Sequence, residues 1–137
     1  LELGATDVFN SNVGDPAESI RELTDGRGAD VAIECVGTTD PIRILIQSVR
    51  KGGAITLVGN VAPSIDLPLQ AVVTRQIRLQ GSCASSGEYP DCINLMSKGV
   101  IKVEALITAV APLAEGPAWF DRLYRQEPNL MKVILKP

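Results

Sequence analysis

The stretch from Ala29 to Val61 constrains the fold more than any other part of the chain. It opens on Ala29–Val36, an apolar and β-branched run without polar alternation, which predicts a strand buried on both faces of a parallel sheet. Apolar residues then recur at helical spacing between Asp40-Pro41, which suit a helix start, and Lys51-Gly52-Gly53, which suit a helix stop. A second apolar run, Ala54–Gly59, follows at once. Strand, helix and strand with short connections predict a right-handed βαβ unit of a doubly wound α/β sheet.

Segments on both sides of this unit add further elements. Asp7–Asn10 is a short strand candidate, and Asp15-Pro16 predicts the start of a helix. Gln76–Gly81 alternates polar and apolar side chains, so only one of its faces can be fully buried. We therefore expect this strand at the edge of a parallel sheet, next to Ala54–Gly59 and following the strand at Ala29–Val36 in chain order.

Charge and composition exclude several classes of protein. The 137 residues carry a formal net charge of −3 and no basic cluster, which argues against a nucleic-acid partner. No apolar run reaches the ~20 residues that span a bilayer. Glu2, Gly4 and Asp7 interrupt the region where a signal peptide needs an apolar core. These features predict a cytoplasmic protein with no membrane partner.

Cysteine and histidine usage limits the chemistry further. Three cysteines stand at irregular spacing, which indicates neither a disulfide framework nor a zinc lobe. Cys35 and Cys92 fall on apolar faces, so we expect plain buried cysteines there. The chain has no histidine, so neither a Ser-His-Asp nor a Cys-His nucleophile is available.

The residues that follow the predicted strands are the natural place for a ligand. In an open doubly wound sheet, ligands bind at the carboxyl ends of the strands. These ends read Cys35–Thr38, Val58–Asn60 and Gly81–Ala84, and each holds a glycine that allows a flat ligand to approach the backbone. Each glycine taken singly is better explained as a strand terminator. Three in succession favour a ligand-binding edge.

Two charged residues allow two interpretations each. Glu34 lies inside an apolar run, where a carboxylate is costly unless it is paired. It suits a general base or a ribose ligand, but a hydrogen-bonded structural carboxylate is the favoured interpretation. Lys132 precedes the last apolar run and is suited to a phosphate, although its spacing by itself indicates only a solvated lysine.

Six segments occur in the order and spacing of one known family: LGATDVFN, GRGADVAIECVG, VRKGGAITLVGN, RQIRLQGS, ALITAVAPL and LMKVILKP. Together they resemble the C-terminal portion of the zinc-type medium-chain alcohol dehydrogenases, most closely the polyol (sorbitol or iditol-like) and threonine dehydrogenase branch. The resemblance implies that residues 1–85 form a partial Rossmann domain, a doubly wound parallel sheet lacking its first two strands. Residues 86–137 would be the segment that returns to the GroES-like catalytic domain. Because two absent strands separate them in the family order, Asp7–Asn10 should not pair with Ala29–Val36.

The same resemblance implies a cofactor site for NAD or NADP. Eight residues match the cofactor contacts of the family, in chain order Val36, Gly37, Val58, Gly59, Asn60, Cys83, Ala84 and Lys132. The first two match the adenine and ribose side, and the next three match the nicotinamide side. The following pair matches residues that close over the nicotinamide, and the lysine matches a basic residue near the pyrophosphate. No catalytic residue or zinc ligand of the family is matched, since these would lie upstream.

The leading hypothesis is a fragment of an NAD(P)-dependent, zinc-requiring dehydrogenase that oxidises polyols or related secondary alcohols by hydride transfer, inactive by itself. The alternative is a stand-alone, non-catalytic nucleotide-binding or dimerisation module. A methyltransferase-like domain is a weaker third reading, because Glu34 near a strand end suits a ribose. The edge strand Gln76–Gly81 also predicts a homo-oligomer through antiparallel pairing with its own copy, as in related dehydrogenases.

Overall fold

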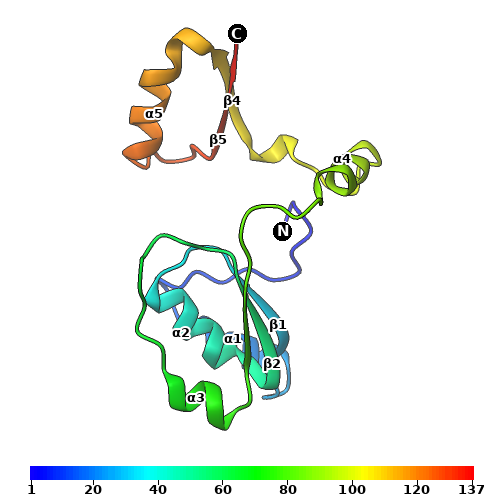
Figure 1. The fold of residues 1–137 in the computed structure, drawn as a ribbon, viewed down its shortest axis with the longest axis vertical. Helices are drawn as coiled ribbons and strands as arrows, with labels where there is room; N and C mark the ends of the chain where they lie inside the picture. Colours follow the sequence, from blue (N-terminus) through cyan, green and yellow to red (C-terminus); the bar gives the residue numbers. More distant parts are fainter. The chain divides into compact units, whose positions relative to one another are not determined.

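The computed structural model describes residues 1–137. The chain forms two compact units (Figure 1). The first unit is Thr6–Ala84, and the second unit combines Leu1–Ala5 with Ser85–Pro137. Each unit has its own parallel sheet, with three strands in the first and two in the second.

The first unit alternates helices and strands. In chain order its elements are α1 (Pro16–Leu23), β1 (Ala29–Glu34), α2 (Thr39–Ser48), β2 (Val49–Leu57), α3 (Leu69–Thr74) and β3 (Arg78–Gly81). The strands are parallel and adjacent in the order β1-β2-β3, which confirms the predicted order and the α/β class. β3 pairs only with β2, so it is the edge strand that its polar alternation predicts.

The starts of the two longer helices follow different rules. Asp15 caps α1 as predicted, because its carboxylate accepts the amide of Ala17 at 2.9 Å and Pro16 occupies the first turn. α2 begins earlier than predicted, with Thr38 at its cap, so Asp40 and Pro41 lie within the first turn. Proline is tolerated there because amides of the first turn have no partner inside the helix.

Gly52 and Gly53 do not stop the helix, contrary to the prediction. β2 begins at Val49 directly after α2, and its pairing with β1 passes from Val49 opposite Ala29 to Ala54 opposite Val31. The extra residues form an irregularity in the strand, where Gly52 has a φ of +72°. A left-handed backbone favours glycine both at a helix end and at a strand irregularity, so glycine here marks the irregularity and not a helix end.

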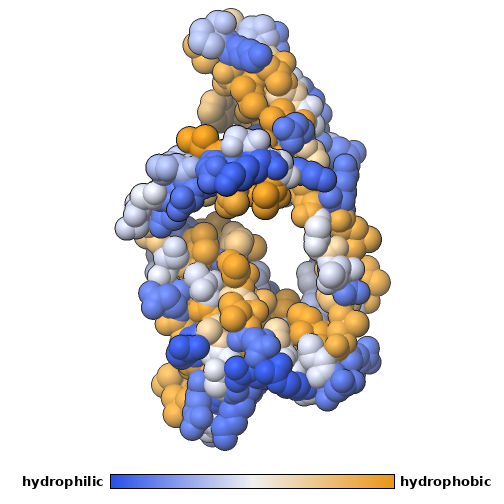
Figure 2. Space-filling view, turned by 90° about the vertical axis from the view of Figure 1, so that its right-hand side faces the viewer, coloured by the Kyte–Doolittle hydropathy of each residue, from blue (hydrophilic) through white to orange (hydrophobic).

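The core of the first unit lies on one face of its sheet, where α1 and α2 lie side by side (Figure 1). Its buried members come from α2, from β2 and from the residue before β3: Ile42, Ile46, Val49, Ile55 and Ile77. On the other face, Val31 and Ile33 of β1 are 62% and 64% exposed. The prediction of a strand buried on both faces is therefore wrong for β1. Hydrophobic residues at the surface are visible in Figure 2.

The predicted strand at Asp7–Asn10 is absent. The segment has no strand conformation, and no strand of the chain pairs with it. A β-strand is stabilised by its ladder of hydrogen bonds, so an unpaired candidate stays irregular. The expectation that this segment does not pair with β1 agrees with the structure.

The second unit buries fewer of its residues than the first unit does. In chain order its elements are α4 (Tyr89–Ser97), the 3-10 helix η1 (Glu104–Leu106), β4 (Ile107–Pro112), the 3-10 helix η2 (Leu113–Glu115), α5 (Gly116–Tyr124) and β5 (Lys132–Lys136). β4 and β5 pair in parallel, and only Ala111 and Gly116 are buried. No helix of either unit has the length and apolar character that crossing a membrane requires.

Cys35 and Cys92 are exposed, as is Cys83, so the prediction of buried cysteines is wrong. Cys92 lies on α4, every residue of which is exposed. An apolar helical face becomes buried only when another element covers it, and no element of the second unit covers α4.

Candidate functional site

The loops that follow β1 and β2 touch through their backbones. Gly37 has a φ of +82°, and a Cβ placed on it would lie 2.6 Å from the carbonyl oxygen of Gly59. A Cβ on Gly59 would in turn collide with the amide nitrogen of Gly37 and with the backbone of Val36. Only glycine at both positions allows the two loops to approach this closely.

Backbone hydrogen bonds join the same two loops. The carbonyl oxygen of Glu34 accepts the amides of Val58 at 2.8 Å and Gly59 at 3.1 Å. The carbonyl oxygen of Gly37 accepts the amide of Ala62 at 2.9 Å. Glu34 ends β1, and Val58 and Gly59 come directly after β2, so the carboxyl ends of β1 and β2 form one continuous edge.

Glu34 has the hydrogen-bond partners that are expected of a structural carboxylate. Its side chain is buried, and its Oε1 accepts the amides of Val36 at 2.8 Å and Gly37 at 2.9 Å. Its Oε2 also accepts the Gly37 amide, at 2.9 Å. The carboxylate thus satisfies the amides of the turn that follows β1.

The third strand end continues this edge. The amide of Ser82 donates to the carbonyl oxygen of Leu57 at 2.9 Å, which sets the end of β3 beside the end of β2. Cys83 and Ala84 follow directly and are exposed, and Ala84 has a φ of +54°. The structure therefore brings every predicted site residue of the first unit to three neighbouring strand ends. Lys132 is exposed on β5 of the second unit and is described within that unit only.

A hollow of about 350 Å³ opens at the end of β1. Val36 is the predicted site residue that lines it, and the others are Ser11, Pro16, Ile33, Glu34, Cys35, Pro41, Ile44 and Leu45. Its volume falls within the range of small-molecule sites, and its lining is mainly apolar, as is usual for such sites. The contribution of Ser11 and of α2 could not be read from the sequence, because no local pattern links them to β1.

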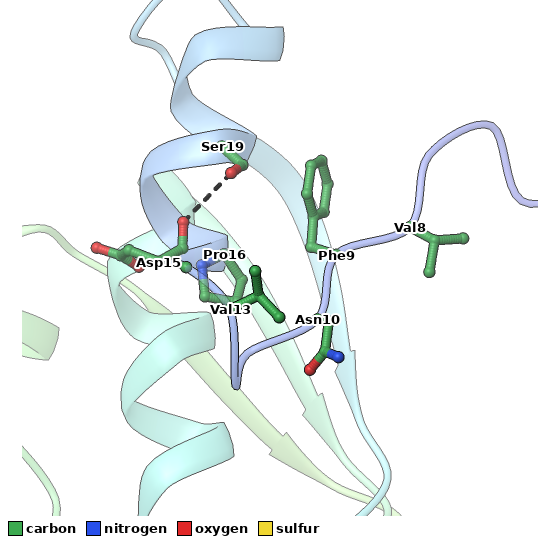
Figure 3. A pocket seen from close by; sticks show the side chains of 8 residues that line it. Val8, Phe9, Asn10, Val13, Asp15, Pro16 and Ser19 are labelled. Carbon is green, nitrogen blue, oxygen red and sulfur yellow. Dashed lines mark hydrogen bonds between the residues drawn. The ribbon is translucent and has the colours of Figure 1, made fainter.

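A second hollow, of about 300 Å³, lies at the start of α1 and is shown in Figure 3. Phe9 and Val13 line it together with Asp15 and Ser19, whose hydroxyl donates to the carbonyl oxygen of Asp15 at 3.3 Å. No predicted site residue lines this hollow. The Asp15 carboxylate already caps α1, so the polar groups here are explained by the helix start.

A cluster of two ion pairs lies at the opposite end of β1. Asp30 accepts hydrogen bonds from Arg27 Nη2 at 2.6 Å and from Arg50 Nε at 2.5 Å. These bonds, from Arg27 first and Arg50 second, hold the pKa of Asp30 well below its usual range. The cluster joins the start of β1 to β2. A further ion pair, between Arg43 and Asp66, joins α2 to the loop that follows β2.

The arrangement defines a class of protein. Parallel strands paired in chain order, helices between them and a glycine-bearing edge at the strand ends are the features of a partial Rossmann domain. Residues 1–98 match the family described as zinc-binding dehydrogenase. The chain belongs to this family of medium-chain alcohol dehydrogenases, as its sequence resemblance predicts.

Individual relatives agree with this assignment. The chain is 30% identical to D-arabitol-phosphate dehydrogenase of Enterococcus avium, a match that covers 98% of this chain and 38% of the relative. It is 32% identical to sorbitol dehydrogenase 1 of Saccharomyces cerevisiae, covering 98% of this chain and 40% of the relative. A crystal structure of an NAD-dependent alcohol dehydrogenase is similar with a TM-score of 0.82 and 26% identity, over 99% of this chain and 39% of that one. The chain thus spans about two fifths of the length of these proteins.

Membership of this family implies NAD(P) and zinc in the intact enzyme. The strand-end loops fit a dinucleotide, because their glycines expose backbone and Val36 borders an apolar hollow. The side chains of this chain do not fit zinc. No group of three histidine, cysteine or acidic side chains is close enough together to hold a metal ion.

Proposed function

We propose that this chain provides the cofactor-binding edge of an NAD(P)-dependent, zinc-requiring dehydrogenase that oxidises polyols or related secondary alcohols. The observation that carries the proposal is the backbone contact between the loops after β1 and β2, which makes a flat, glycine-bearing edge at the carboxyl ends of parallel strands. The sorbitol and arabitol-phosphate dehydrogenases among the relatives support the substrate class.

In this proposal the loop residues bind and orient the cofactor. Val36 and Gly37 contact the adenosine side, where Val36 borders the hollow of about 350 Å³. Val58, Gly59 and Asn60 support the nicotinamide side. When bound, the dinucleotide supplies the hydride acceptor.

Three further positions complete the proposed contacts. The small side chains of Cys83 and Ala84 exclude water above the nicotinamide, and Lys132 provides a cation for the pyrophosphate. In this proposal the chain supplies no acid, base or metal ligand to the reacting atoms. Such groups would come from other parts of an intact enzyme.

The two parts of the chain are proposed to belong to different domains. We assign residues 1–85 to the nucleotide-binding domain and residues 86–137 to the segment that returns to a GroES-like catalytic domain. The boundary between the units after Ala84 supports this division, whereas Leu1–Ala5 group with the second unit. The sparse burial in the second unit also supports it, since α4 and one face of β4 and β5 remain uncovered.

We also propose that a second copy of this chain pairs with β3. β3 has a neighbour on one side only, and Arg78 is its only charged residue. The Ser82 amide points toward β2, so by strand alternation the amide of Gly81 points to the open side. An antiparallel pairing about a two-fold axis would join the two sheets.

Dinucleotide titration tests the cofactor proposal. NADH and NADPH are titrated into the protein expressed from its natural gene, with fluorescence as the readout, and polyol oxidation is assayed on the same preparation. A Val36→Glu variant sets a carboxylate beside the hollow and should weaken binding about tenfold or more, since it repels the phosphates. Val13→Glu makes the same change at a residue that is 83% exposed and serves as the matched control.

The outcomes separate the candidate functions. Binding that is lost only in Val36→Glu, together with polyol oxidation, supports the dehydrogenase. Binding without oxidation of any alcohol favours the stand-alone nucleotide-binding module. Absence of binding to either dinucleotide, or equal binding by Val36→Glu, contradicts the proposed site.

A further inference from the structure

Glu34 is the one charged side chain buried in this chain, with 2% of its surface exposed. It is the last residue of β1, and the two loops of the proposed cofactor edge begin beside it. A buried carboxylate is costly unless its oxygens accept hydrogen bonds, so its partners indicate what it is retained for.

The two ends of Glu34 hold two different loops. The carboxylate accepts the amide of Val36 at 2.8 Å and receives the amide of Gly37 on both oxygens, at 2.9 Å each. The backbone carbonyl accepts the amides of Val58 and Gly59 from the loop after β2. The side chain therefore sets the first loop, and the main chain sets the second.

We infer that Glu34 is a positioning residue for the adenosine side of the dinucleotide, an inference that rests on the proposed function. Val36 borders the hollow beside β1 only while the turn after β1 keeps its conformation. The carboxylate fixes that turn through its amides, and no other side chain bonds to them. The nicotinamide side depends instead on the carbonyl of Glu34, which any residue provides.

The Glu34→Gln variant separates the role of the carboxylate from the role of the backbone carbonyl, because it keeps the size and the backbone of Glu34. A carboxylate has two acceptor oxygens, whereas an amide side chain has one acceptor and one donor group. The Gly37 amide is shared between both oxygens, so Glu34→Gln sets a donor against a donor there. The Val36–Gly37 turn should loosen while the Val58–Gly59 loop keeps its contacts.

The experiment compares the affinities of ligands that represent the two halves of the cofactor. Adenosine monophosphate, nicotinamide mononucleotide and NADH are titrated calorimetrically into the wild-type protein, Glu34→Gln and Glu22→Gln. Glu22 is an exposed carboxylate on α1, so it controls for the chemical change. Glu34→Gln should weaken adenosine monophosphate and NADH about tenfold and change nicotinamide mononucleotide by less than about twofold, whereas Glu22→Gln changes none of them.

Three results would overturn the inference. Wild-type affinities in Glu34→Gln would remove any role for the carboxylate. An equal loss for both cofactor halves would show a general structural role. A wild-type protein that binds none of the three ligands would overturn the proposed function, and that failure is visible without any variant.

A measurement on the unchanged protein keeps the test valid where Glu34→Gln fails to fold. Amide hydrogen exchange reports whether the Val36 and Gly37 amides are bonded before any ligand is present. Slow exchange at both amides, with little further change when adenosine monophosphate is added, supports a turn that is already formed before the ligand binds. Fast exchange at either amide in the free protein would contradict the positioning role.

Discussion

Gly37 and Gly59 occupy the space that each other's side chain would need. A Cβ on either residue would collide with the backbone at the other, and Gly37 also has a left-handed φ of +82°. The two glycines belong to loops that follow different strands, 22 residues apart in their numbering. The predicted ligand edge is thus a single interlocked structure, and a change in one loop acts on both.

Gly59→Ala tests this contact. The added Cβ meets only backbone atoms, which cannot move aside cheaply, so unfolding should become easier by about 1–3 kcal/mol. Urea denaturation measures the change. Gly81→Ala is the matched control, because a Cβ at Gly81 meets nothing within 4 Å. Equal stability of the two variants would show that the loops do not interlock in solution.

The Asp30 cluster predicts a pH dependence of stability. Its hydrogen bonds from Arg27 and Arg50 lower the pKa of Asp30 in the folded protein relative to about 3.9 in the unfolded chain. The stabilisation is therefore fully present above the unfolded pKa and is lost as the pH falls through the folded pKa. Urea midpoints at pH 6 and pH 3 should differ more in the wild type than in Asp30→Asn.

An exposed carboxylate without an ion pair provides the comparison for this prediction. Glu18 on α1 belongs to none of the ion pairs of the chain. Glu18→Gln should keep the wild-type difference between the two pH values. If Asp30→Asn also keeps it, the cluster does not contribute to acid sensitivity.

The edge of β3 predicts association. Sedimentation should show a dimer at micromolar concentration, and Gly81→Pro should shift it toward monomer by removing an amide on the open side. Gly81→Ala keeps that amide and should remain dimeric. Ile77 is unsuitable for this test, because it is buried and its amide already donates to Val72. A wild-type protein that sediments as a clean monomer would contradict the proposed pairing.

The composition predicts the catalytic properties of the polypeptide itself. The 137-residue chain should produce no NADH from polyols and should hold less than one zinc ion per chain. The reason is that it has no histidine and no cluster of metal-ligating side chains. Metal analysis and an absorbance assay of NADH formation measure both properties. Steady NADH production, or one bound zinc per chain, would contradict the assignment of these groups to other parts of an enzyme.

The sequence by itself determined the elements whose signals are local. The βαβ unit followed from apolar runs and helical spacing, and the cap of α1 followed from Asp15-Pro16. The edge position of β3 followed from its polar alternation. Each of these signals lies within a few residues of the element that it predicts, so no distant contact was needed to read it.

Only the tertiary structure decided which apolar faces are covered and which loops meet. Val31, Ile33 and Cys92 are apolar in pattern but exposed, because coverage depends on elements elsewhere in the chain. The contact of Gly37 with Gly59 likewise arises from the pairing of β1 with β2. Side-chain periodicity specifies a face and a conformation, whereas burial and convergence at a site depend on packing between segments that are distant in sequence.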